Sequence, residues 1–109
     1  MPTVYVVNKG AHDCSDAKRY GNLVYMSEGS VSRYATATVY RDFAYYLCDS
    51  KPEDYILITG LSVMVGIACG IFASLHGKLN LLLFKPGRGG EQGFYIERVI
   101  MIKELLKGK

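Results

Sequence analysis

Short apolar runs rich in β-branched and aromatic residues recur along this chain, and polar or glycine-containing segments separate them. The runs predict strands at residues 4–7, 23–26, 55–58, 78–84 and 94–102. Between the second and third runs, a mixed 3.6-residue pattern predicts a helix that begins at Ser30 or Ser32 and ends near Cys48. A shorter helix is expected to begin at Ser15 or Asp16.

The most apolar stretch, residues 55–77, combines a strand and a helix. Residues 55–58 form a continuous apolar run closed by a Thr-Gly pair, as in a strand buried on both faces. The residues that follow predict a helix with Ser62 as its N-cap and Gly77 at its C-terminal end. A strand that turns directly into a helix is the first half of a βαβ unit, so we expect this helix N-terminus at the carboxyl edge of a sheet.

The same stretch permits a membrane helix as an alternative. Residues 55–75 carry no charge over a length that spans a bilayer, and Gly66 and Gly70 have the spacing seen in membrane helix pairs. Polar residues and a glycine at positions 59–62 interrupt the run where a turn is expected, which favours the strand and helix. The small residues then let the helix pack closely against a sheet or a twin helix, and we expect no membrane partner.

The order of the predicted elements is typical of a small α/β domain. We expect one domain over residues 1–109, a Rossmann-like three-layer sandwich built on a mostly parallel sheet of about five strands. The strand at residues 94–102 is expected to lie antiparallel at a sheet edge, followed by a short basic helix at residues 103–109.

The composition narrows the classes of function. Half of the residues are hydrophobic, 21% are charged and the net charge is +3, an ordinary globular mixture without the basic tract of a nucleic-acid-binding protein. Cys14, Cys48 and Cys69 cannot all pair and show no metal-binding spacing, which favours a reducing cytoplasm and argues against a structural zinc site. We expect no secretion signal before the first strand, and no motif indicates a cofactor.

Polar, turn-forming segments follow three of the predicted strands, at residues 8–16, 27–33 and 59–62. Ligands of open α/β sheets bind beyond the carboxyl ends of the strands, where helix N-termini offer free amides to anions. We therefore expect a phosphate-bearing ligand at this edge, although serines and glycines in such places also serve as ordinary helix caps. The candidate ligand-binding residues of this kind are Asn8, Ser27, Gly29, Thr59, Gly60 and Ser62.

A denser group of polar side chains follows the first predicted strand. Its candidate ligand-binding residues are His12, Asp13, Ser15 and Asp16. They would contact ribose hydroxyls or base edges, and His12 or Asp13 would serve as acid or base if the protein were a phosphodiesterase. A solvated polar loop would have the same sequence, and the spacing matches no strong metal-ligand pattern. Arg33 and Tyr34 fall in the first turn of a predicted helix, where they would hold phosphate and base or simply lie in solvent.

Three motifs resemble a group of small phage-encoded proteins. They are His-Asp-x-Ser-Asp-Ala at residues 12–17, Lys-Pro-Glu-Asp-Tyr-Ile-Leu at 51–57 and His-Gly-Lys-Leu-Asn-Leu-Leu-Leu-Phe at 76–84. In that group an asparagine would stand where this chain has Val65, and the resemblance implies that this position faces the ligand edge. Residues 58–64 are also similar to the strand-turn-helix by which CARF-type domains hold cyclic oligonucleotide signals across a two-fold axis.

These features lead to three hypotheses for function. The first is a phage protein of the host cytoplasm that binds and sequesters a nucleotide-derived signalling molecule, as an anti-defence sponge, and forms a homodimer or a higher homo-oligomer. The second is a phosphodiesterase-type enzyme that cleaves such a nucleotide. The third is a protein-protein interaction module that uses a tyrosine-rich helix with Tyr40, Tyr45 and Tyr46 and binds no small ligand.

Overall fold

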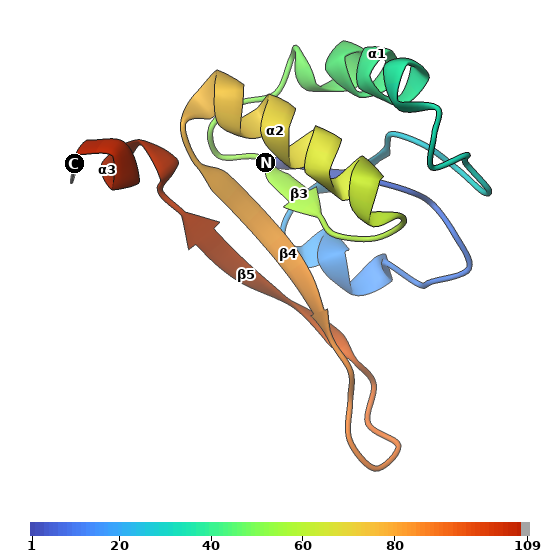
Figure 1. Ribbon diagram of the computed structural model, residues 1–109. Coiled ribbons are helices and arrows are strands. Elements are labelled where there is room, and N and C mark those ends of the chain that lie inside the picture. The colour runs from blue at the N-terminus through green and yellow to red at the C-terminus, as the bar shows by residue number, and fades with distance from the viewer. Residues whose placement is uncertain (108–109) are drawn as a thin grey trace.

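A twisted sheet forms the centre of the molecule (Figure 1). The computed structural model describes residues 1–107, and within them the sheet has five strands in the order β2-β1-β3-β4-β5. The strands are β1 (Thr3–Val6), β2 (Asn22–Tyr25), β3 (Tyr55–Leu57), β4 (Leu79–Lys85) and β5 (Phe94–Ile100). The first four run parallel, and β5 pairs antiparallel with β4 at the edge. The predicted α/β architecture with a mostly parallel sheet is therefore confirmed.

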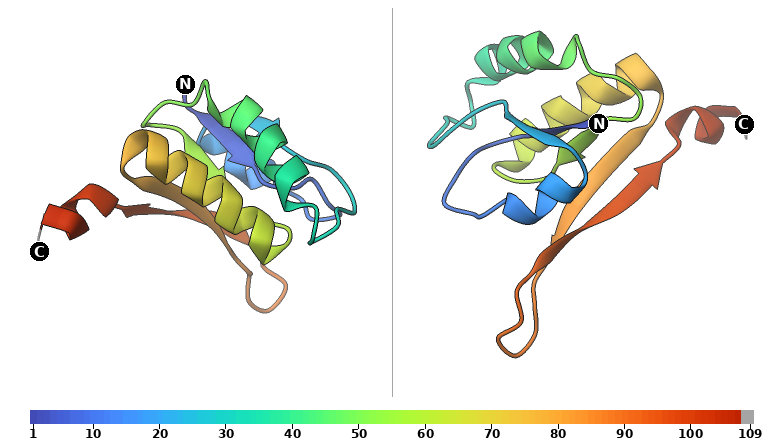
Figure 2. Two further views of the ribbon diagram at one scale, coloured as in Figure 1. Left: turned by 45° about the horizontal axis from the view of Figure 1, so that its top comes forward. Right: turned by 180° about the vertical axis from the view of Figure 1, so that it is seen from behind.

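Helices cover both faces of this sheet (Figure 2). Two long helices, α1 (Thr36–Leu47) and α2 (Ser62–His76), lie side by side on one face. The 3₁₀ helix η1 (Ser15–Arg19) packs against the other face. The last helix, α3 (Ile102–Lys107), follows β5 and points away from the sheet (Figure 1), and residues 108 and 109 of the predicted tail helix lie outside the described residues.

The central strands contribute side chains to two separate cores, because successive residues of a strand point to opposite faces. Tyr5 and Ile56 pack beneath α1 and α2, whereas Val4, Val6 and Leu57 pack against η1. All five are at most 6% exposed. Burial on both faces explains why these strands appear in the sequence as continuous apolar runs rather than as alternating ones.

Helix α1 begins later than the sequence predicts, at Thr36 rather than at the serines before it. The Ser32 hydroxyl accepts a hydrogen bond from the Tyr34 amide at 3.3 Å, and the Ala35 amide donates to the Ser32 carbonyl at 3.2 Å. Serine side chains that bond the backbone in this way compete with helix formation. Arg33 and Tyr34 consequently lie in a turn, and their predicted place in the first turn of a helix is wrong.

Helix α2 has the predicted extent, but its N-cap is Leu61 and not Ser62. The chain turns at Gly60, whose φ is +94°, and Leu61 follows with an extended backbone (φ −69°, ψ 143°). The turn is thus complete one residue before the predicted cap, and Ser62 is already helical. At the other end Gly77 closes the helix in the left-handed conformation, with a φ of +70°, as predicted.

The alternative of a membrane-spanning helix finds no support in the described part of the chain. Within residues 1–107, no helix is long and apolar enough to cross a bilayer.

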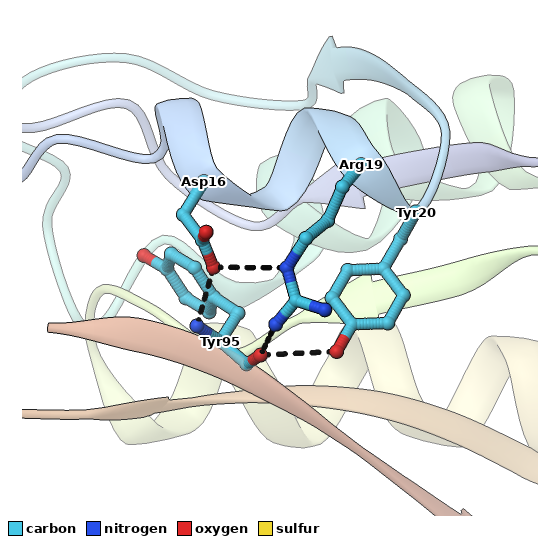
Figure 3. A network of polar contacts seen from close by, with 4 residues as sticks. All are labelled: Asp16, Arg19, Tyr20 and Tyr95. Carbon is cyan, nitrogen blue, oxygen red and sulfur yellow. Dashed lines mark hydrogen bonds and ion pairs between the residues drawn. The ribbon is translucent and has the colours of Figure 1, made fainter.

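A network of polar contacts fastens the outer edge of β5 to η1 (Figure 3). The Asp16 carboxylate accepts hydrogen bonds from the Tyr95 amide at 2.7 Å and from Arg19 Nε at 3.4 Å. Arg19 and Tyr20 both donate to the Tyr95 carbonyl oxygen, Tyr20 at 3.0 Å. This edge latch satisfies backbone groups of an edge strand that would otherwise be open to pairing with another chain.

The face of the sheet that carries η1 also holds a tyrosine whose ionisation should affect stability. A hydrogen bond to the Glu97 carboxylate, together with partial burial, raises the pKa of Tyr55 to about 12. The unfolded chain has a tyrosine pKa of about 10, so it releases this proton at a lower pH than the folded chain. The stability that Tyr55 contributes is therefore complete below about pH 10 and is lost as the pH rises through about 12.

Urea unfolding at increasing alkaline pH checks this expectation. The free energy of unfolding should fall between about pH 10 and about pH 12 in the natural protein, and it should fall less in Tyr55→Phe, which has no phenolic proton to lose. Equal falls in the two proteins would show that Tyr55 does not carry the effect.

Candidate functional site

A pocket opens at the carboxyl ends of β1, β2 and β3, with a volume of about 270 Å³. We call it the edge pocket. It is lined by Asn8, Gly29, Ser30, Val31, Gly60, Leu61 and Met64. Strand β2, the next strand in the chain, pairs with one side of β1, and β3 pairs with the other side. The pocket therefore lies at the point where the order of the strands reverses. Open parallel sheets bind their ligands at such a point.

Asn8 ties the loops around the edge pocket together. Its side-chain amide donates to the Gly29 carbonyl at 3.1 Å, which joins the end of β1 to the loop after β2. The Ser27 hydroxyl lies 2.9 Å from Asn8 Oδ1 and 2.7 Å from the Val7 carbonyl oxygen, and it donates its hydrogen bond to these acceptors. Backbone pairing continues past the strands, because the Lys9 amide donates to the Ser27 carbonyl at 2.8 Å. The predicted residues Asn8, Ser27 and Gly29 therefore form one hydrogen-bonded unit.

Gly60 completes the pocket on the side of β3, directly after Thr59. A Cβ atom at position 60 would stand 2.9 Å from the Asn8 Cβ, closer than side-chain carbons approach one another. The φ of +94° is also one that residues with a side chain rarely adopt. Only glycine lets the turn after β3 pass this close to the end of β1.

The N-terminus of α2 follows the pocket at once. The first bonds within the helix come from the Met64 and Val65 amides, which both donate to the Leu61 carbonyl. The amides of Ser62 and Val63 precede these bonds, and no side chain among residues 1–104 caps them. Free amides and the partial positive charge of a helix N-terminus favour an anion at this end of the helix.

The other predicted polar residues line a different hollow, the hairpin pocket, of about 170 Å³. Its lining comprises His12, Asp13, Ser15, Asp16, Phe84, Gln92 and Gly93. The β1–η1 loop forms one wall, and the β4–β5 hairpin forms the other. The His12 ring meets the Phe84 ring edge to face, with centroids 4.5 Å apart. The candidates predicted to act together on one ligand thus divide between two pockets.

The carboxylates of the hairpin pocket already accept hydrogen bonds within the chain. Asp13 accepts a hydrogen bond from the Ser15 amide at 2.9 Å, and this bond lowers the pKa of Asp13, so the group stays ionised in neutral solution. Asp16 belongs to the edge latch. Two carboxylates repel a phosphate, so the chemistry of this pocket suits hydroxyls or amine groups rather than anions.

Six of the predicted residues line neither pocket. Ser27 bonds Asn8, and Thr59 and Ser62 adjoin the lining residues Gly60 and Leu61 in the chain. Arg33 and Tyr34 are exposed in the turn before α1, and neither is among the lining residues. Val65 is half-buried and packs against the core beneath the two long helices. Within residues 1–107, no three histidine, cysteine or acidic side chains come together as metal ligands do.

Comparison with known proteins places the chain in a family. Residues 2–99 match the model of a family described as phage Pam3 gp32-like protein. The chain belongs to this family. A search of the curated proteins finds no match, and a search of the solved structures finds none either.

Membership in the Pam3 gp32-like family confirms the resemblance to phage-encoded proteins. The matched residues include all that line the edge pocket and the hairpin pocket. The likeness to CARF-type domains and the Rossmann-like classification stay predictions.

Several lining residues of this phage protein were not anticipated from its sequence. Leu61 and Met64 contribute apolar surface to the edge pocket. Because they lie on either side of the predicted cap Ser62, their sequence positions could have indicated that they line this site. Phe84 and Gln92 reach the hairpin pocket from the β4–β5 hairpin, for which the sequence offers no such signal. Lys9 adds a cation beside the edge pocket, with its ammonium 5.0 Å from the centre of the Tyr25 ring.

Proposed function

We propose that the protein binds a small nucleotide-like ligand at the edge pocket and retains it without cleaving it. The observation that carries this proposal is the meeting of Asn8, Gly29 and Gly60 in one pocket at the point where the strand order reverses. These residues come from three separate loops. Such a place is where α/β proteins of many activities bind their ligands.

The polar groups around the edge pocket suit the phosphate of such a ligand. The α2 N-terminus supplies uncapped amides, and Lys9 and the net charge of +3 supply a mildly positive surrounding. None of the lining residues is acidic. The volume of about 270 Å³ is near the lower end of the range for ligand pockets, so a phosphate and its sugar would fill it and the base would extend outward.

Retention without cleavage fits the residues at hand. Cleavage of a phosphodiester needs an acid or base within hydrogen-bond reach of the phosphate. His12 and Asp13, the candidates for that role, line the hairpin pocket and not the edge pocket. A sequestering protein needs only a tight complex, for which the edge pocket has apolar walls and backbone donors.

The phage family gives this binding a biological setting. A phage protein that captures a signalling nucleotide would withhold it from the defence of the infected cell, and it would act in the host cytoplasm, where such nucleotides are made. We propose this anti-defence role as the consequence of the binding.

Calorimetric titration with inorganic phosphate, adenosine monophosphate and a cyclic dinucleotide tests the proposal. The cyclic dinucleotide should bind best, and Asn8→Ala should weaken its binding roughly ten- to hundredfold, since the loops lose their tie and the pocket its amide. Asn22→Ala, which alters an exposed asparagine on β2, is the matched control and should bind as the natural protein does. Absence of binding to every nucleotide, or equal affinity in Asn8→Ala, would contradict the proposal.

A further inference from the structure

Helix α2 is mostly apolar around its circumference, yet one side of it is open to solvent. The residues from Ser62 to His76 include no aspartate, glutamate, lysine or arginine. Met64, Ala68 and Phe72 face the core and are fully buried, whereas Gly66, Gly70 and Ser74 are exposed along a line with a four-residue period. A helix without a polar face is normally covered on every side.

A groove runs between α1 and α2 on this open side, with a volume of about 460 Å³. Its walls come from Tyr40, Ala44 and Cys48 of α1 and from Gly70, Ile71, Ser74 and Leu75 of α2. Tyr40 is 58% exposed and Leu75 is 52% exposed. We call the groove, together with the line of small residues on α2, the two-helix face.

The glycines of the two-helix face are not needed for packing within the chain. A Cβ atom built at Gly66 or at Gly70 meets no other atom within 4 Å. Each glycine within a helix costs about 1 kcal/mol relative to alanine. The predicted close packing against the sheet therefore does not explain them, whereas close approach of another helix does.

The charge of this face favours a second copy of the chain as the partner. Copies with a net charge of +3 repel one another, and they approach most readily where the surface is neutral. On α1 the charged side chains are Arg41 and Asp42, which lie 3.9 Å apart and offset each other, and α2 has none. A two-fold axis through this face brings no like charges together.

The size and shape of the two-helix face agree with such a dimer. Helices of this length, each about 10 Å wide, present an outline of roughly 20 by 20 Å, and the accessible surface of a ridged face exceeds its outline. The outline is about half of the roughly 800 Å² that each partner buries in a standard interface, and the ridges of the two helices add to it. A two-fold axis at Gly70 brings the glycine lines of the two copies into contact, and the protruding Tyr40 side chains then flank the helix crossing.

We propose that the protein forms a two-fold homodimer through the two-helix face, with α2 of one copy crossing α2 of its partner at Gly70. Because the edge latch occupies backbone groups of β5, less of this strand is free to pair with a strand of another copy. The proposed dimer is therefore formed by the helices. The proposal is independent of the ligand at the edge pocket, because none of the groove residues lines that pocket.

Sedimentation velocity over a wide range of protein concentrations tests the dimer with Gly70→Arg. The side chain enters open space in the monomer and arginine favours the helix more than glycine does, so the monomer should keep its helical content and its thermal stability. The dimer should dissociate, with at least a hundredfold rise in its dissociation constant. Gly10→Arg is the matched control, because Gly10 also has open space around its Cβ position and lies in the β1–η1 loop, and it should stay dimeric.

Two results would overturn the proposal. One is a natural protein that sediments as a monomer at every concentration, which would leave the face to a different partner or to none. The other is a dimer that survives Gly70→Arg, which would place the contact elsewhere on the surface, such as at the exposed Val99 and Ile100 of β5.

Discussion

Replacing Gly60 with alanine should both destabilise the protein and greatly weaken ligand binding. The left-handed φ of +94° costs an L-residue about 1–2 kcal/mol. The new methyl group would also stand 2.9 Å from the Asn8 Cβ, so one of the two loops must move, at a further cost of about 1 kcal/mol. We expect a loss of about 2–3 kcal/mol in the free energy of unfolding, and affinity for a cyclic dinucleotide reduced at least a hundredfold.

Gly90→Ala separates the loss of binding from simple backbone strain. Gly90 has a comparable φ of +88°, lies in the β4–β5 hairpin and has no atom within 4 Å of its Cβ position. It should therefore show the strain but not the loss of affinity, as measured by urea unfolding and by calorimetric titration. A Gly60→Ala protein that binds the dinucleotide as the natural protein does would remove Gly60 from the binding site.

Replacing Asp16 with alanine should release the β4–β5 hairpin from η1. Tyr95 is 1% exposed, and its amide would lose its carboxylate partner, which costs about 1–3 kcal/mol for a buried donor. Arg19 would lose its ion pair at the surface, which adds less than about 1 kcal/mol. We expect a loss of about 2–3 kcal/mol in the free energy of unfolding, together with much faster hydrogen exchange at the Tyr95 amide.

Asp13→Ala is the matched control for the latch. It removes the same side chain three residues earlier, where the carboxylate accepts the Ser15 amide in an exposed turn. Its effect on the free energy of unfolding should be much smaller than that of Asp16→Ala, and hydrogen exchange at the Tyr95 amide should be unchanged. Equal destabilisation by the two substitutions, or a Tyr95 amide still protected in Asp16→Ala, would show that the latch does not hold the hairpin.

The architecture of the sheet was predictable because its central strands are buried on both faces. Burial of this kind makes β1, β3 and β4 short apolar runs with turn residues at their ends, and it leaves little choice about where each strand lies. The start of α1 was not predictable in the same way. Ser32 serves equally well as a helix cap or as a turn former, and the hydrogen bond to the Tyr34 amide decides for the turn.

The candidate site was predictable only where it follows from topology. Asn8 and Gly60 meet because parallel neighbouring strands end at the same edge, and the sequence contains the order of the strands. The hairpin pocket depends instead on a tertiary contact, since the Asp16 carboxylate bonds an amide 79 residues away. The twist of the sheet brings the edge of β5 to η1, and no local pattern in the sequence predicts this contact.

The most direct test of the proposed binding is to map amide chemical shifts by NMR while a cyclic dinucleotide is added to the full chain. We predict saturable shifts at Asn8, Gly29 and Gly60 and at the first amides of α2, with the hairpin pocket and the two-helix face largely unchanged. Shifts confined to His12, Asp13 and the β4–β5 hairpin, or no shifts at all, would contradict the assignment of the edge pocket as the ligand site.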